Sequence, residues 1–94
     1  MYMEEKAKKI AELLKILANE NRLLILCQLI DGPKTVSRLA EGIPGITQSA
    51  LSQHLGLMKA YGILDSSKSG QNITYTILDH RVEEILSVLK KHYC

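Results

Sequence analysis

The sequence predicts a small, mainly helical α+β domain with five helices and a two-stranded β-hairpin, in the order α-α-α-α-β-β-α. Three observations support this fold class. Apolar residues at positions 10, 13, 14 and 17 recur with helical spacing. A turn rich in glycine and proline spans residues 42–46 and separates two helix-like segments. Ile73, Tyr75 and Ile77 alternate with threonines, which is the period of a half-buried strand. The 94 residues are expected to form one domain, 1–94.

The first half of the chain is predicted to hold three helices. The first covers residues 4–17. Asn19 offers a side-chain oxygen as the N-cap of the second, residues 20–30. That helix is apolar most of the way round, with a stripe of Leu23, Leu26, Cys27 and Ile30, so it is expected at the centre of the core. Thr35 is predicted to cap a short third helix, residues 36–41.

The second half is predicted to hold two helices around a hairpin. Thr47 is expected to cap a helix over residues 48–61, which Gly62 ends. Strands at 63–66 and 73–77 are joined by a loop at 67–72, and Asp79 caps a last helix over residues 80–92. Two helices joined by a short turn and followed by a hairpin describe a winged helix-turn-helix. The alternative is a small α+β domain whose helix pair does not touch DNA.

Composition excludes several classes of function. No apolar run approaches the ~20 residues of a membrane span, and the N-terminus has no apolar signal region, so a cytoplasmic protein without a membrane partner is expected. The absence of Trp and Phe argues against a stacking platform for single strands. No Ser-His-Asp order, glycine-rich phosphate loop or carboxylate pair supports an enzyme, and no cofactor is expected. The net charge of +2 permits nucleic-acid binding without indicating it.

The helix from Gln48 carries the candidate DNA-binding residues. Leu51, Leu55 and Met58 share its apolar face, and the other face carries Gln48, Ser49, Ser52, Gln53 and Lys59. Glutamine can pair with the edge of adenine, and serine can bond to bases or phosphates. The N-terminal half of a recognition helix is the half that reaches base edges. This face therefore predicts major-groove reading, with an ordinary solvated face as the alternative.

Four further residues complete the predicted DNA site. His54 lies one residue from the apolar stripe, where a structural or phosphate-contacting role is more common than a catalytic one. In the hairpin loop, Lys68 supplies charge, and Gln71 and Asn72 supply hydrogen-bonding groups beside the helix. The alternative for the loop is an ordinary hairpin turn.

These segments resemble the ArsR/SmtB family of dimeric transcriptional repressors. LANENRLLIL at residues 17–26 resembles its second-helix signature. QSALSQHL at residues 48–55, followed by GIL at 62–64, resembles its recognition helix and first wing strand, and Tyr75 matches a tyrosine of the second strand. The resemblance implies a homodimer through the first and last helices, bound to an inverted-repeat operator in double-stranded DNA.

Within that family, the cysteines resemble those of the thiol-sensing group of BigR, SqrR, YgaV and HlyU. Cys27 stands inside the second helix and Cys94 at the end of the last. The third helix lacks the paired cysteines of the arsenic and cadmium sensors. The zinc pattern on the last helix is incomplete, with Asp79-His80 and later only His92. The resemblance implies that Cys27 and Cys94 form a switch driven by a small sulfur species or oxidant.

Alternatives to this switch remain open from the residues. Cys27 lies on an apolar stripe, where a buried, inert cysteine is common. A metal bound by Cys27, Cys94 and His92 would give a metal-responsive repressor of the same fold. A winged-helix protein-interaction module without DNA binding is the third reading.

Overall fold

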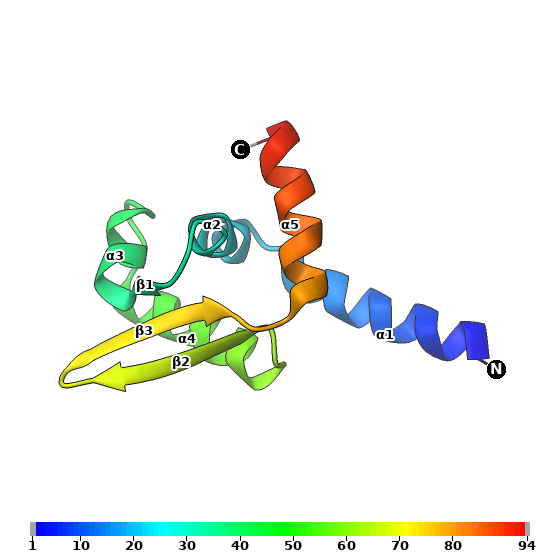
Figure 1. The fold of residues 1–94 in the computed structure, drawn as a ribbon, viewed down its shortest axis with the longest axis horizontal. Helices are drawn as coiled ribbons and strands as arrows, with labels where there is room; N and C mark the ends of the chain where they lie inside the picture. Colours follow the sequence, from blue (N-terminus) through cyan, green and yellow to red (C-terminus); the bar gives the residue numbers. More distant parts are fainter. Residues whose placement is uncertain (1, 94) are drawn as a thin grey trace.

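The computed structural model describes residues 2–93, and its elements confirm a mainly helical fold with a β wing (Figure 1). The elements are α1 (Tyr2–Leu17), α2 (Glu20–Leu29), β1 (Lys34–Thr35), α3 (Val36–Glu41), α4 (Gln48–Ala60), β2 (Leu64–Ser69), β3 (Asn72–Ile77) and α5 (His80–Tyr93). All five predicted helices are present, and no end differs from the predicted one by more than two residues.

The predicted helix caps are confirmed by side-chain oxygens that accept backbone N–H groups in the first turn of each helix. The four pairs are Asn19 with Arg22 at 3.1 Å, Thr35 with Arg38 at 3.2 Å, Thr47 with Ala50 at 3.0 Å, and Asp79 with Arg81 at 2.9 Å. Each bond satisfies a donor that the helix itself leaves without a partner. Local sequence therefore sets where these helices begin.

The predicted two-stranded hairpin is confirmed as β2 and β3, but the prediction missed a third strand, β1, which completes a sheet in the order β1-β3-β2. Lys34 pairs with Tyr75 and Thr35 with Thr74, in antiparallel register. A two-residue strand has no periodicity that a sequence could reveal, and it forms only because β3 lies beside it. This pairing holds the start of α3 against the wing.

The predicted loop 67–72 is also wrong, because both strands of the wing continue through it. Ser69 pairs with Asn72, so only Gly70 and Gln71 form the turn. Gly70 has a φ of +62°, which a residue with a side chain adopts only at a cost. The second half of β2 was missed because its residues, Ser66–Ser69, are polar and show no apolar alternation. They can be polar because β2 is exposed over most of its length.

The core lies where α2, α4, the first residue of β2 and the first half of α5 meet. Ile25 and Leu26 in α2 are fully buried, which confirms that this helix is central. The predicted stripe is rotated, however: Leu29 is buried, whereas Leu23, Cys27 and Ile30 are half-buried. A helix that is apolar on nearly all sides gives no strong signal for which side faces inward.

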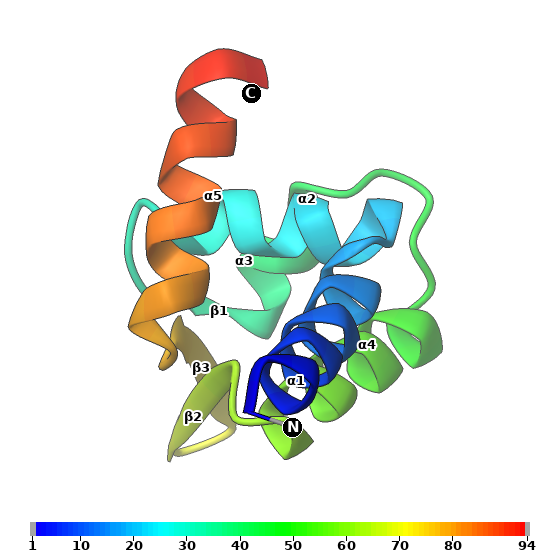
Figure 2. The ribbon, with the colours of Figure 1, turned by 90° about the vertical axis from the view of Figure 1, so that its right-hand side faces the viewer.

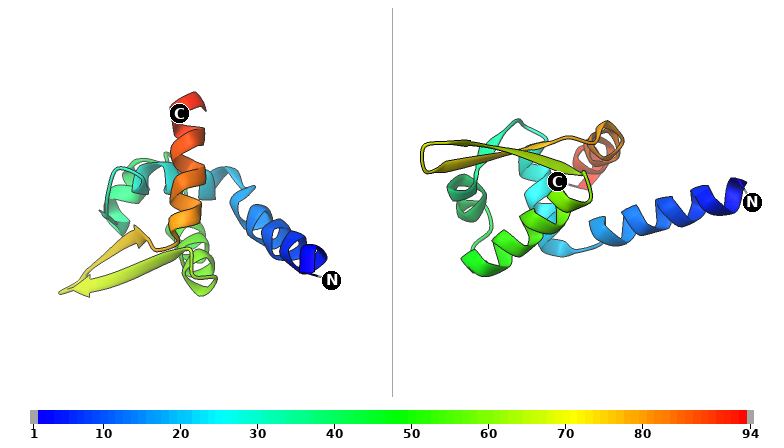
Figure 3. Two further views of the ribbon diagram at one scale, coloured as in Figure 1. Left: turned by 45° about the vertical axis from the view of Figure 1, so that its right-hand side comes forward. Right: turned by 90° about the horizontal axis from the view of Figure 1, so that it is seen from below.

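Helices α1 and α5 project from the rest of the fold (Figures 1, 2 and 3). Several of their apolar side chains are exposed. Only Ile16 and Leu17, at the end of α1, are buried. Ile10 is 56% exposed, Leu14 is 48% exposed and Val88 on α5 is 58% exposed. The apolar stripe predicted for the first helix is therefore present: Leu13 and Leu17 pack against the core, whereas Ile10 and Leu14 remain exposed.

Candidate nucleic-acid interface

Three buried apolar side chains of helix α4 determine which of its faces is exposed to solvent. Leu51 and Met58 are fully buried, and Leu55 is 1% exposed. Ser49, Ser52 and Gln53 are exposed on the remaining surface. Because the buried residues recur at helical spacing, rotation of α4 would expose the core, so the polar face is held outward.

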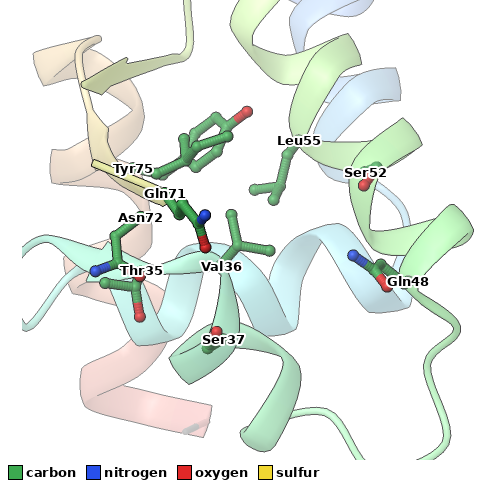
Figure 4. Close-up of a pocket in the computed structure, with 10 residues that line it drawn as sticks. Thr35, Val36, Ser37, Gln48, Ser52, Leu55, Gln71, Asn72 and Tyr75 are labelled. Carbon is green, nitrogen blue, oxygen red and sulfur yellow. The ribbon is translucent and has the colours of Figure 1, made fainter. Parts of the chain in front are cut away.

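A cleft lies between the start of α4 and the wing, and four of the predicted DNA-binding residues, Asn72 of β3 among them, line it (Figure 4). Gln48 and Ser52 lie on the α4 side of the opening, and Gln71 lies on the β3 side. The cleft has a volume of about 280 Å³, near the lower end of the ~300–1,000 Å³ typical of small-molecule pockets. Its hydroxyl and amide groups can donate to phosphate oxygens.

Sequence reasoning missed several residues that line the same cleft. Thr35 is the last residue of β1, Ser37 lies in the first turn of α3, and Tyr75 lies in β3. Thr35 was expected only as a helix cap, a role it also fills. These side chains reach the cleft because β1 pairs with β3, and no signal in the sequence indicates that pairing.

The two predicted lysines lie outside the cleft. Lys59, in the last turn of α4, donates to the Ser66 hydroxyl of β2 with an Nζ–Oγ distance of 2.7 Å. Lys68 is exposed on β2, opposite Ile73 of β3. Lys59 therefore joins the helix to the wing, whereas Lys68 presents its charge to solvent near the wing tip.

His54 contacts the protein rather than standing alone on the helix. Its Nδ1 accepts a hydrogen bond from Nε of Arg22 in α2 at 3.2 Å. Partial burial, and secondly the charge of Arg22, lower the pKa of His54 below its usual value of 6.5. The ring is therefore neutral at pH 7, and with Nδ1 as acceptor its proton is on Nε2.

The two cysteines stand differently in the structure. Cys27 is half-buried in α2, and Cys94 lies outside the described residues. Helix α5 packs against α2, and Lys90 of α5 contacts Asp31, just beyond α2, with an Nζ–Oδ1 distance of 2.5 Å. The hydrogen bond from Lys90, and then its charge, lower the pKa of Asp31. The ion pair thus joins α5 to the segment that follows α2.

Within residues 2–93, no group of three or more His, Cys, Asp or Glu side chains could hold a metal ion. His80 instead lies 3.9 Å from Glu83, and Asp79 pairs with Arg81. No helix in the same range is long and apolar enough to cross a membrane.

The fold and the polar face of α4 define the class: a winged helix-turn-helix protein whose fourth helix and wing flank a hydrogen-bonding cleft. The family model described as "Bacterial regulatory protein, arsR family" matches residues 19–66, from the cap of α2 into β2. The chain belongs to this family of bacterial transcription regulators.

Similar proteins cover nearly the whole chain. The transcriptional regulator YgaV of Escherichia coli is 39% identical over 92 residues, which are 98% of this chain and 93% of YgaV. Reduced HlyU from Vibrio cholerae superposes with a TM-score of 0.92 at 38% identity, over 99% of this chain and 97% of that one. The homodimeric winged helix-turn-helix domain of Mb0332 from Mycobacterium bovis has a TM-score of 0.79 at 25% identity, over 95% and 82%.

Proposed function

We propose that this regulator is a homodimeric repressor that binds an inverted-repeat operator through α4 and is switched by the thiols of Cys27 and Cys94. The observation that carries the DNA-binding part is the exposed face of α4. Ser49, Ser52 and Gln53 are held outward by the buried Leu51 and Leu55. A face made of small hydroxyl and amide groups, rather than of Glu and Lys, suits contact with base edges.

The wing and the cleft supply contacts to the DNA backbone in this proposal. As α4 enters the major groove, a phosphate of the adjacent strand lies against the donors of Ser37, Ser52 and Gln71. Lys68 adds a charge at the wing that acts on any sequence. A repressor of this kind acts by occupying the operator, and it works in the cytoplasm, where bacterial DNA is.

The homodimer forms through α1 and α5. Ile10 and Leu14 on α1 and Val88 on α5 are about half exposed, and both helices project from the core. A chain of 94 residues buries only ~60–65% of its unfolded surface alone, so covering these side chains adds stability that it needs. The Mb0332 domain, which has the same fold, is described as homodimeric.

The switch couples sulfur chemistry to the spacing of the two α4 helices. A peroxide takes two electrons and two protons from the thiols of Cys27 and Cys94, leaving a disulfide and two waters. A persulfide donor instead transfers its outer sulfur atom to each thiol and leaves as a thiol, and the two cysteine persulfides then condense to a trisulfide with release of hydrogen sulfide. Two features support this proposal: α5 packs on α2, and Cys27 is only half-buried. A link between these helices would shift the dimer interface relative to α4 and lower operator affinity.

In the experiment, the reduced protein is treated with a persulfide donor or a peroxide. The masses of the products are determined by mass spectrometry, and their affinity for the operator is measured. We expect an intramolecular link and weaker binding, both lost when Cys27→Ser or Cys94→Ser is introduced. Release from DNA by the double serine variant would refute the switch. Release by a metal ion added to reduced protein would favour a metal-responsive repressor. Absence of salt-dependent DNA binding would favour a protein-interaction module.

A further inference from the structure

Arg22 joins three helices by hydrogen bonds. Its backbone N–H belongs to the first turn of α2 and donates to Asn19 Oδ1 at 3.1 Å. Its guanidinium Nε donates to Nδ1 of His54 in α4 at 3.2 Å, and a terminal guanidinium nitrogen donates to the carbonyl of Ile16 in α1 at 3.1 Å. The side chain thus connects α1 with α4 from a fixed place at the start of α2.

Both acceptors depend on Arg22 for physical reasons. The Ile16 carbonyl is one of the last four of α1, which have no acceptor role within the helix, and Ile16 is 8% exposed. The imidazole of His54 is half-buried, and this is its only hydrogen bond within the described residues. Leaving either partly buried acceptor without a donor is unfavourable, so the pair of bonds resists movement of α4 relative to α1.

Only arginine at this place serves both acceptors at once. The guanidinium is planar and presents its donors in a rigid fork, so a donor to Ile16 and a donor to His54 have a fixed relative direction. A lysine ammonium is a single point on a flexible stem and is suited to one acceptor at a time. The two acceptors, Ile16 and His54, lie 38 positions apart in sequence, and the Arg22 side chain bridges them.

We infer that Arg22 is a positioning residue that sets the spacing and angle of the two α4 helices on DNA, by holding His54 of α4 to the end of the α1 dimerisation helix. This inference rests on the proposed function, in which α1 joins two copies and α4 reads DNA. Neighbouring half-sites are about 34 Å apart, and one added base pair changes that distance by about 3.4 Å. A firmly held α4 pair therefore distinguishes operators that differ by one base pair in spacing.

The test compares two operators for each variant. An operator is first selected from a random duplex pool with the parent protein, and a second version receives one extra base pair between its half-sites. The spacing ratio is the affinity for the first divided by the affinity for the second. Arg22→Met removes both donors and keeps an apolar stem, and Arg22→Lys keeps the charge. Lys8→Met is the control that removes one exposed charge on α1 away from its apolar stripe.

We expect a spacing ratio of at least about tenfold for the parent and for Lys8→Met, and about threefold or less for Arg22→Met and Arg22→Lys. Non-specific affinity should remain within about twofold in Arg22→Lys, because its charge is unchanged. Thermal unfolding shows whether each variant is folded, and Arg22→Lys provides the result if Arg22→Met is not.

A second pair of variants shows whether Arg22 acts through His54. His54→Asn places an amide oxygen near the position of Nδ1, and His54→Leu offers no acceptor. His54→Asn should keep more of the spacing ratio than His54→Leu, and Arg22→Lys should cause no further loss in the His54→Leu background. An unchanged spacing ratio in folded Arg22→Lys, or losses that multiply in the double variant, would overturn the inference. Failure of the parent to bind DNA would overturn the proposed function as well.

Discussion

Two glycines, one inside α4 and one just after it, should change the stability of the protein in opposite directions when each is replaced by alanine. Gly56 lies within α4, its φ is not positive, and a Cβ built on it meets nothing within 4 Å. Alanine is favoured over glycine inside a helix by about 1 kcal/mol, so Gly56→Ala should stabilise the protein by that amount. For a domain of this size, this corresponds to a rise in Tm of about 4–8 °C.

Gly62 follows α4 and has a φ of +75°. A Cβ there also meets nothing within 4 Å, so the cost of alanine is conformational and not a clash. The left-handed conformation costs a residue with a side chain about 1–2 kcal/mol, and Gly62→Ala should lower the Tm accordingly. Both variants are measured by thermal unfolding at one protein concentration, because the Tm of a dimer depends on concentration. A lower Tm for Gly56→Ala, or an unchanged one for Gly62→Ala, would refute the reasoning.

Three further predictions concern the cap, the histidine and the interface. Thr47→Ala should cost about 1 kcal/mol in urea unfolding, and Thr47→Ser should restore most of it, because the hydroxyl accepts the Ala50 N–H. The free energy of unfolding should fall as pH drops below 6.5, because the lowered pKa of His54 beside Arg22 means that the unfolded chain binds more protons; His54→Asn should flatten that slope. Leu14→Glu, at a half-exposed apolar site on α1, should give monomers in sedimentation, whereas Lys15→Glu should not.

The parts of the fold that follow from local sequence were predictable. Apolar spacing predicted the five helices. The capping residues Asn19, Thr35, Thr47 and Asp79 predicted where the last four of them begin. Strand β1 was not predictable, since its two residues become a strand only when Tyr75 and Thr74 lie beside them. The length of the wing was missed for a related reason: an exposed strand such as β2 needs no apolar alternation.

The candidate site divides in the same way. Gln48, Ser52 and Gln71 were predicted from residue type, and the structure brings them to one cleft. The bond between Arg22 and His54 spans 32 positions in sequence, and only the packing of α2 beside α4 creates it. Contacts of this kind depend on tertiary arrangement, so residue type and spacing could indicate His54 as unusual but could not name its partner.

One series of binding measurements tests whether α4 reads the DNA sequence while the wing supplies charge. Operator and scrambled duplexes are titrated over a range of salt concentrations with the parent, Gln53→Ala and Lys68→Ala. We predict that Gln53→Ala loses about 1–3 kcal/mol on the operator and little on the scrambled duplex, with an unchanged salt slope. Lys68→Ala should weaken both duplexes alike and reduce the salt slope by about one. If Gln53→Ala binds the operator as tightly as the parent does, α4 does not read DNA in the way proposed.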